Sequence, residues 1–133
     1  TSITFCHFLG SIPFLENYNL IHKPSYELTS DIINWNLDFG IIINPVPHPD
    51  LVIKELGKDI VTWYQNKKPA KKIIYNPMLA QSRKILKKIN FTYQGYIHSR
   101  SLELIAKLTA NGQGYGLIPS RIAETHKNIF PWL

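Results

Sequence analysis

The alternation of short β-type runs with amphipathic helical segments is the feature that most constrains the fold of this chain. Runs rich in β-branched and aromatic residues are separated by segments whose apolar side chains recur every three or four positions. Strands are predicted over 3–8, 20–23, 39–43, 51–56, 60–64, 72–75, 92–97 and 115–118. Helices are predicted over 26–37, 80–89 and 101–111, with a last helix opening at Pro119 and Ser120. This alternation predicts an α/β fold.

Two segments have strong local signals. Residues 39–43 form a wholly apolar run before a proline-rich stretch, which is typical of a strand buried on both faces of a parallel sheet. Residues 101–111 have leucine and isoleucine in helical step, a serine at the start and Gly112 just past the end. Because a sheet buried on both faces must be covered, we expect helices to pack against it.

The formal net charge of +6 is distributed unevenly along the chain. Residues 1–59 carry three lysines against seven acidic residues, a net charge of −4, whereas residues 60–133 carry a net charge of +10. Within the helix predicted over 80–89, Ile85, Leu86 and Ile89 are expected to face inward. The cations expected to face outward are Arg83, Lys84, Lys87 and Lys88. Neither interleaved aromatic rings nor polar base readers accompany these cations or the basic segment 67–72, so we interpret both as solvated.

Composition and length exclude several classes of protein. A chain of 133 residues that is 44% hydrophobic can bury a core and is not intrinsically disordered. No window approaches the roughly 18 continuous apolar residues of a membrane span, so no membrane partner is expected. The single cysteine, Cys6, cannot form an internal disulfide, which favours a reducing, cytoplasmic setting. Because the chain starts at Thr1 without a methionine, we interpret it as a fragment.

Motifs that carry catalytic or metal chemistry are weak. The glycines of segment 112–116 follow a predicted helix rather than a strand, so they predict a helix cap and a turn instead of a phosphate-binding loop. The five histidines offer no pair at the short spacing of metal ligands, and no metal or cofactor is expected. His48 with Asp50 is a minor candidate for a general base and its orienting carboxylate. We therefore predict no catalytic residue and no enzyme.

A ligand site is predicted from the sheet itself, because ligands of open α/β sheets bind outside the carboxyl ends of the strands. Four loops are selected in this way: 7–11, 44–48, 76–81 and 98–101. The candidate ligand-binding residues are His7, Phe8, Ser11, Asn44, Pro45, His48, Met78, Gln81, Ser99 and Ser101. Helix starts near Ser82 and Ser101 favour an anionic ligand. For each residue, helix capping or turn formation is the alternative role.

Two blocks of sequence carry a family resemblance. The segment Asn36-Leu-Asp-Phe-Gly-Ile-Ile-Ile-Asn-Pro resembles the leucine-aspartate-leucine-glycine-isoleucine segment of LysR-type transcriptional regulators. Residues 101–123 resemble the family's serine-leucine-glutamate segment, which is followed by a glycine-x-glycine-x-glycine-leucine-leucine-proline segment. The two blocks occur in family order, and with the residues adjoining the first they cover about a third of the chain.

The resemblance implies an effector-binding domain with a bilobal fold like that of type 2 periplasmic binding proteins, made of two Rossmann-like lobes. Residues 1–59 would form the first lobe and residues 60–133 the second. A small, anionic effector would be held in the cleft between the lobes. DNA binding would belong to an amino-terminal winged helix-turn-helix that this chain lacks, and the full-length protein would be a homo-oligomer.

The chain departs from the family pattern in two places. The segment between the first two predicted strands is shorter than is usual in the family. The chain also stops at 130–133, before the strand and helix that normally return to the first lobe. The first lobe is therefore expected to be incomplete and the fold to be truncated at its carboxyl end. Two alternatives stay open: a solute-binding or catalytic protein of the same bilobal fold, and an interaction module that uses the lysine-rich face.

Overall fold

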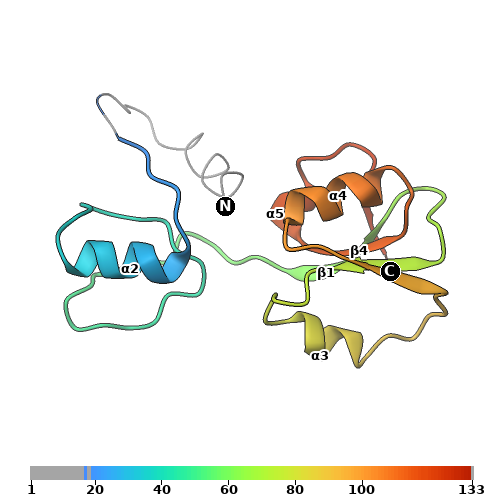
Figure 1. Cartoon of the computed structure of the whole chain (residues 1–133), viewed down its shortest axis with the longest axis horizontal. Coiled ribbons are helices and arrows are strands. Elements are labelled where there is room, and N and C mark those ends of the chain that lie inside the picture. The colour runs from blue at the N-terminus through green and yellow to red at the C-terminus, as the bar shows by residue number, and fades with distance from the viewer. Residues whose placement is uncertain (1–16, 18, 133) are drawn as a thin grey trace. The chain divides into compact units, whose positions relative to one another are not determined.

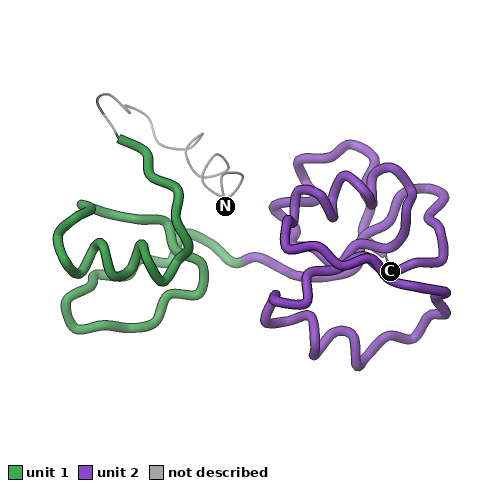
Figure 2. The backbone as a smooth tube through the Cα atoms, in the orientation of Figure 1, with its two compact units in different colours: residues 1–58 green, residues 59–133 purple. Residues whose placement is uncertain are grey.

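The computed structural model describes residue 17 and residues 19–132, and the chain divides into two compact units (Figure 2). Unit 1 spans residues 1–58 and unit 2 spans residues 59–133. The strand predicted over 3–8 lies outside the described residues, as do Cys6 and the candidate ligand-binding residues His7, Phe8 and Ser11.

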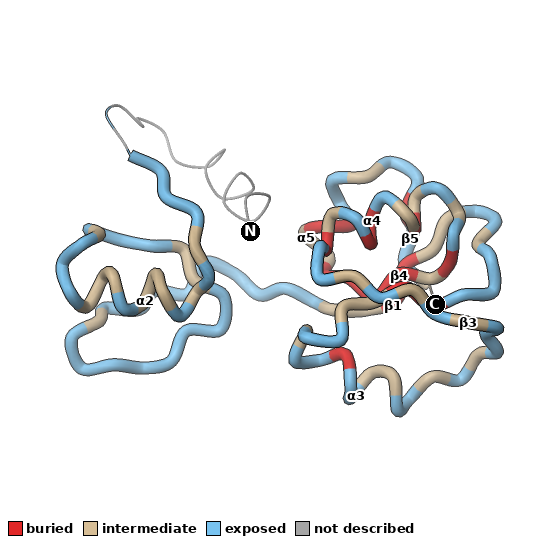
Figure 3. The backbone as a smooth tube through the Cα atoms, viewed as in Figure 1, coloured by how far each residue is buried: buried red, intermediate tan, exposed pale blue. Residues whose placement is uncertain are grey.

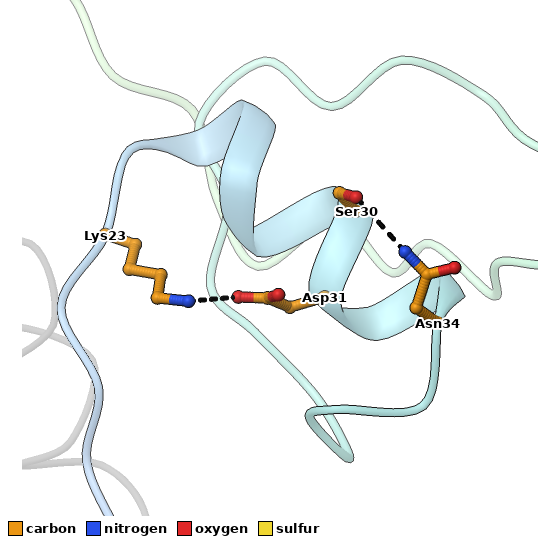
Figure 4. A network of polar contacts seen from close by, with 4 residues as sticks. All are labelled: Lys23, Ser30, Asp31 and Asn34. Carbon is orange, nitrogen blue, oxygen red and sulfur yellow. Dashed lines mark hydrogen bonds and ion pairs between the residues drawn. The ribbon is translucent and has the colours of Figure 1, made fainter.

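Unit 1 contains the helix α2 (Ser25–Ile33), which is shorter than the predicted 26–37. The helix ends early because the chain enters a left-handed conformation at Trp35, where φ is 61°. Lys23 Nζ donates to Asp31 Oδ2 at 2.7 Å, and Asn34 Nδ2 donates to Ser30 Oγ at 3.3 Å (Figure 4). The bond between Lys23 and Asp31 raises the pKa of the lysine and lowers that of the carboxyl group.

Three strand predictions in unit 1 are wrong, because residues 20–23, 39–43 and 51–56 form no strand. No described residue of unit 1 is buried, and Phe39 is 58% exposed (Figure 3). An apolar run becomes a strand only where a neighbouring strand accepts and donates its backbone hydrogen bonds, and none of these runs is paired in this way. Residues 39–43 pass close to α2 instead: a Cβ added at Gly40 would lie 2.9 Å from Ile32 Cδ1.

Unit 2 is a small α/β unit built on a mixed five-stranded sheet. Its elements are β1 (Val61–Gln65), β2 (Lys72–Tyr75), α3 (Ser82–Leu86), β3 (Gly95–His98), α4 (Leu102–Ala110), β4 (Tyr115–Pro119), α5 (Ser120–Ala123) and β5 (Phe130–Pro131). The strand order is β3-β2-β4-β1-β5, in which β2 is parallel to β3 and β4 while β1 is antiparallel to β4 and β5. Helices α4 and α5 lie on one side of the sheet and α3 lies on the other (Figure 1).

The predictions for unit 2 are largely confirmed. The four strands predicted after residue 59 correspond to β1–β4, and the three predicted helices correspond to α3, α4 and α5. The main differences are the later start of β3, the shortness of α3 and the additional strand β5. Among the helices of the described residues, none has both the length and the apolar character needed to cross a bilayer.

The core of unit 2 lies on both faces of β4, whose residues 116–119 are all buried. On one face Leu117 packs with Trp63 and Ile73, and the predicted inward stripe Ile85, Leu86 and Ile89 packs against this cluster. On the other face Gly116 lies directly against Thr109 of α4. Since successive strand residues point to opposite faces, β4 packs against the helices on both sides of the sheet.

The glycine-rich segment is a helix cap and a turn, as predicted. Gly112 N donates to Thr109 O at 2.9 Å and Gln113 N donates to Leu108 O at 3.0 Å, which is the Schellman pattern at the end of α4. Gly112 has φ of 74°, a left-handed conformation in which a Cβ is strained. The turn then leads the chain directly into β4.

The contact between Gly116 and α4 yields a test of this packing. A Cβ at Gly116 would overlap Thr109 Oγ1, so we expect Gly116→Ala to lower the free energy of unfolding by about 1–3 kcal/mol. Urea unfolding followed by circular dichroism measures the change. Gly95→Ala is the matched control, since nothing lies within 4 Å of a Cβ there. Adding Thr109→Ala should restore part of the loss, and equal stability of Gly116→Ala and Gly95→Ala would contradict the packing.

Candidate functional site

The carboxyl ends of three strands meet at one edge of the unit 2 sheet, because β2 is parallel to both β3 and β4. The segments at these strand ends are 76–81, 98–101 and 119–121, of which the last two begin with the final residues of β3 and β4. Ser99 N donates to Tyr75 O at 3.2 Å, which joins the end of β3 to the end of β2. We call the three segments the carboxyl edge of unit 2. It contains four of the predicted ligand-binding residues: Met78, Gln81, Ser99 and Ser101.

Asn76 organises the first two segments of this edge. Its side-chain Nδ2 donates to Arg100 O at 3.3 Å, and its Oδ1 accepts from Met78 N at 2.9 Å. Its backbone oxygen accepts from the hydroxyl of buried Ser82 at 2.7 Å. Sequence reasoning included Asn76 in a loop range but did not single it out. The signal was the Asn-Pro pair directly after a strand, since asparagine bonds readily to the backbone of its own turn.

Ser99 and Ser101 form a short hydroxyl network at the start of α4. Ser101 N donates to Ser99 Oγ at 3.0 Å, and Ser101 Oγ accepts from Leu104 N at 3.1 Å. Ser101 Oγ also lies 3.1 Å from Glu103 Oε2, to which it donates. Ser101 is therefore the side-chain cap of α4, which agrees with the predicted helix start.

Met78 and Gln81 present their side chains differently from the serines. Met78 is 70% exposed, and Gln81 is exposed at the start of α3 without a side-chain bond to the helix. A thioether and a free amide on one loop supply an apolar contact and a group that both donates and accepts hydrogen bonds. Both side chains are therefore available to a ligand.

The third segment of the edge is held by Asp59, which lies 61 residues before Ser120. Asp59 Oδ1 accepts from Ser120 Oγ at 2.7 Å and from Arg121 N at 3.4 Å, while Asp59 Oδ2 pairs with the Arg121 guanidinium. The Arg121 side chain is only 11% exposed, and its burial lowers the pKa of the guanidinium. Asp59 thus caps α5 and pairs with an arginine of the same short helix. Sequence reasoning missed this contact because no local pattern connects residues so far apart.

The remaining candidates, Asn44, Pro45 and His48, belong to unit 1. Asn44 has φ of 52°, a left-handed conformation that asparagine tolerates, and all three residues are exposed. His48 Nδ1 accepts from the backbone N–H of Asp50 at 3.2 Å and lies 3.7 Å from Asp50 Oδ2. An orienting carboxylate would instead accept a hydrogen bond from a protonated Nδ1. The pair therefore lacks the geometry of an oriented general base.

Within the described part of the chain, no three histidine, cysteine or acidic side chains lie close enough to hold a metal ion. In comparisons with known proteins, no family model and no curated protein matches the chain. The candidate site therefore stands on its geometry and on the sequence resemblance alone.

The contact between Asp59 and Arg121 predicts a loss of stability when the carboxylate is removed. We expect Asp59→Ala to lower the free energy of unfolding by about 2 kcal/mol, because it removes a charge-assisted bond from a largely buried guanidinium. Asp59→Asn should lower the free energy of unfolding by less, since the side-chain oxygen of the asparagine still accepts a hydrogen bond from Ser120. Asp50→Ala is the control, because that carboxylate is 73% exposed. Equal urea midpoints for Asp59→Ala and Asp50→Ala would contradict the assignment.

Proposed function

We propose that this chain is the effector-binding domain of a LysR-type transcriptional regulator and senses a small molecule. The proposal includes a bilobal fold like that of type 2 periplasmic binding proteins, in which units 1 and 2 correspond to the two lobes. It also places the protein in the cytoplasm and assigns DNA binding to a winged helix-turn-helix outside this chain.

The observation that carries the proposal is the meeting of three strand ends at the carboxyl edge of unit 2. Ligands of α/β sheets bind at such edges, and this one has an available thioether at Met78 and amide at Gln81. The second family-like block, 101–123, folds as α4, a glycine turn, β4 and α5. It therefore supplies segment 119–121 of the edge and Ser101 of segment 98–101.

The charge of unit 2 supports an anionic effector. Residues 60–102 contain nine lysines and arginines and no acidic residue. The start of α4 contributes partial positive charge, although Glu103 already balances part of it. A small carboxylate or another organic anion is the ligand class that this distribution favours.

A thermal-shift screen of small organic anions tests the function. A ligand that binds only the folded chain stabilises it by about 2.7 kcal/mol at a concentration of 100 times its Kd, so the unfolding temperature should rise with ligand concentration. Gln81→Ala should weaken the response to the anion that binds. Gln113→Ala is the matched control, because it removes another exposed glutamine, in the turn that precedes β4.

The effector function would be contradicted if two results were both obtained. They are no stabilisation by any member of a broad panel of anions, and failure of the full-length protein to bind its promoter fragment. Equal loss of the response in Gln81→Ala and Gln113→Ala would contradict the site but leave the function standing. The residues encoded upstream of Thr1 give an independent check, since the proposal requires a helix-turn-helix there.

A further inference from the structure

Helix α3 and the turn that follows it carry a basic face on the outside of unit 2. Its members are Arg83, Lys84, Lys87 and Lys88, which are all exposed. Together with Ala80 they line an open depression of about 360 Å³. The cations occur as two adjacent pairs offset by four residues, a rise of about 6 Å along a helical path.

Nothing in the described part of the chain neutralises this basic face. The ion pairs found there join Lys23 to Asp31 and Asp59 to Arg121, and neither involves α3 or the residues just after it. Arg83 and Lys87 stand one turn apart, as do Lys84 and Lys88, so like charges repel along the segment. A bound polyanion would relieve that repulsion.

Exposed aromatic rings lie on the same side of the sheet as α3. Tyr96 pairs in register with Ile73, whose side chain packs in the cluster that α3 covers, and His98 pairs with Tyr75. Tyr96 is 65% exposed, and its ring stacks on that of His98 with centroids 4.6 Å apart and an interplanar angle of 20°. These rings belong to β3, an edge strand of the sheet. The basic face and the ring pair therefore share one side of unit 2.

We propose that this side of unit 2 binds single-stranded nucleic acid, with phosphates on the basic face and an unpaired base stacked on the exposed ring of Tyr96, which His98 supports from its other side. Cationic grooves combined with aromatic stacking platforms are the usual means of binding single strands. An acidic protein partner is disfavoured because the depression has no large apolar anchor, which protein interfaces place at their centre. The proposal does not depend on the effector function, since the four cations and Tyr96 lie outside the carboxyl edge.

Fluorescence anisotropy with a labelled oligothymidylate of about 20 nucleotides tests the proposal, because single-strand sites cover up to roughly 16 nucleotides. The key variant replaces all four cations of the basic face with glutamine. The matched control replaces Lys67, Lys68, Lys71 and Lys72 with glutamine, which changes the net charge equally at exposed positions in the connection before β2 and at the first residue of β2. We expect the α3 variant to lose affinity at least tenfold more than the control. Its slope of log K against log salt should be shallower by about 2–3, at about 0.7 per lost phosphate contact.

The stacking contact has its own variant. Tyr96→Ala should weaken single-strand binding roughly tenfold, in the range measured for loss of one stacked base, without changing the salt slope. Tyr26→Ala is the control, because that tyrosine of unit 1 is 73% exposed. The fourfold α3 variant must keep the wild-type circular dichroism spectrum. If it does not, the double variant Lys84→Gln, Lys88→Gln is tested in its place.

Several results would overturn the proposal. They are absence of oligothymidylate binding by the wild-type chain at low salt, equal losses in the α3 and control variants, and an unchanged affinity in Tyr96→Ala. Tighter binding to a duplex of the same length, to polyglutamate or to phosphatidylserine vesicles would also overturn it, because each would identify a different partner.

Discussion

The close packing of β4 between two helical layers is the contact on which the rest of unit 2 depends. Leu117 faces the cluster covered by α3, whereas Gly116 and Thr109 let α4 approach the opposite face. The same strand pairs with β2 in parallel and with β1 in antiparallel orientation. One strand therefore sets the distances to both helical layers and aligns the strand ends from which the carboxyl edge is built.

The carboxyl edge follows from that alignment and is stiffened by polar contacts within unit 2. Asn76 joins the segments after β2 and β3, Ser101 begins α4, and Asp59 holds α5 through Ser120 and Arg121. These bonds occupy the hydroxyl groups of the serines and the carboxylate of Asp59. The side chains of Met78 and Gln81 stay exposed. The effector function and single-strand binding are assigned to different residues of unit 2, so neither proposal requires the other.

Sequence patterns predicted unit 2 well and unit 1 poorly, for a physical reason. The stripe of Ile85, Leu86 and Ile89, the cap at Ser101 and the left-handed Gly112 depend on neighbours within a few positions, so a local pattern is sufficient. The apolar run 39–43 needs a partner strand, and a pattern cannot show whether one is beside it. The contact of Asp59 with Arg121 and the placement of Tyr96 on the α3 side also arise from distant parts of the chain.

The amino-acid order alone specifies the helical stripes, the caps, the glycine turn and the uneven charge, because each depends on spacing along the chain. The uneven charge became informative only in the folded unit, where four cations of α3 and the turn after it line one depression. The mixed sheet order, the antiparallel β1, the meeting of the strand ends and the shared side of the basic face and aromatic rings emerge only on folding. They depend on which strands pair, and that choice is made by burial and hydrogen bonding between residues far apart in sequence.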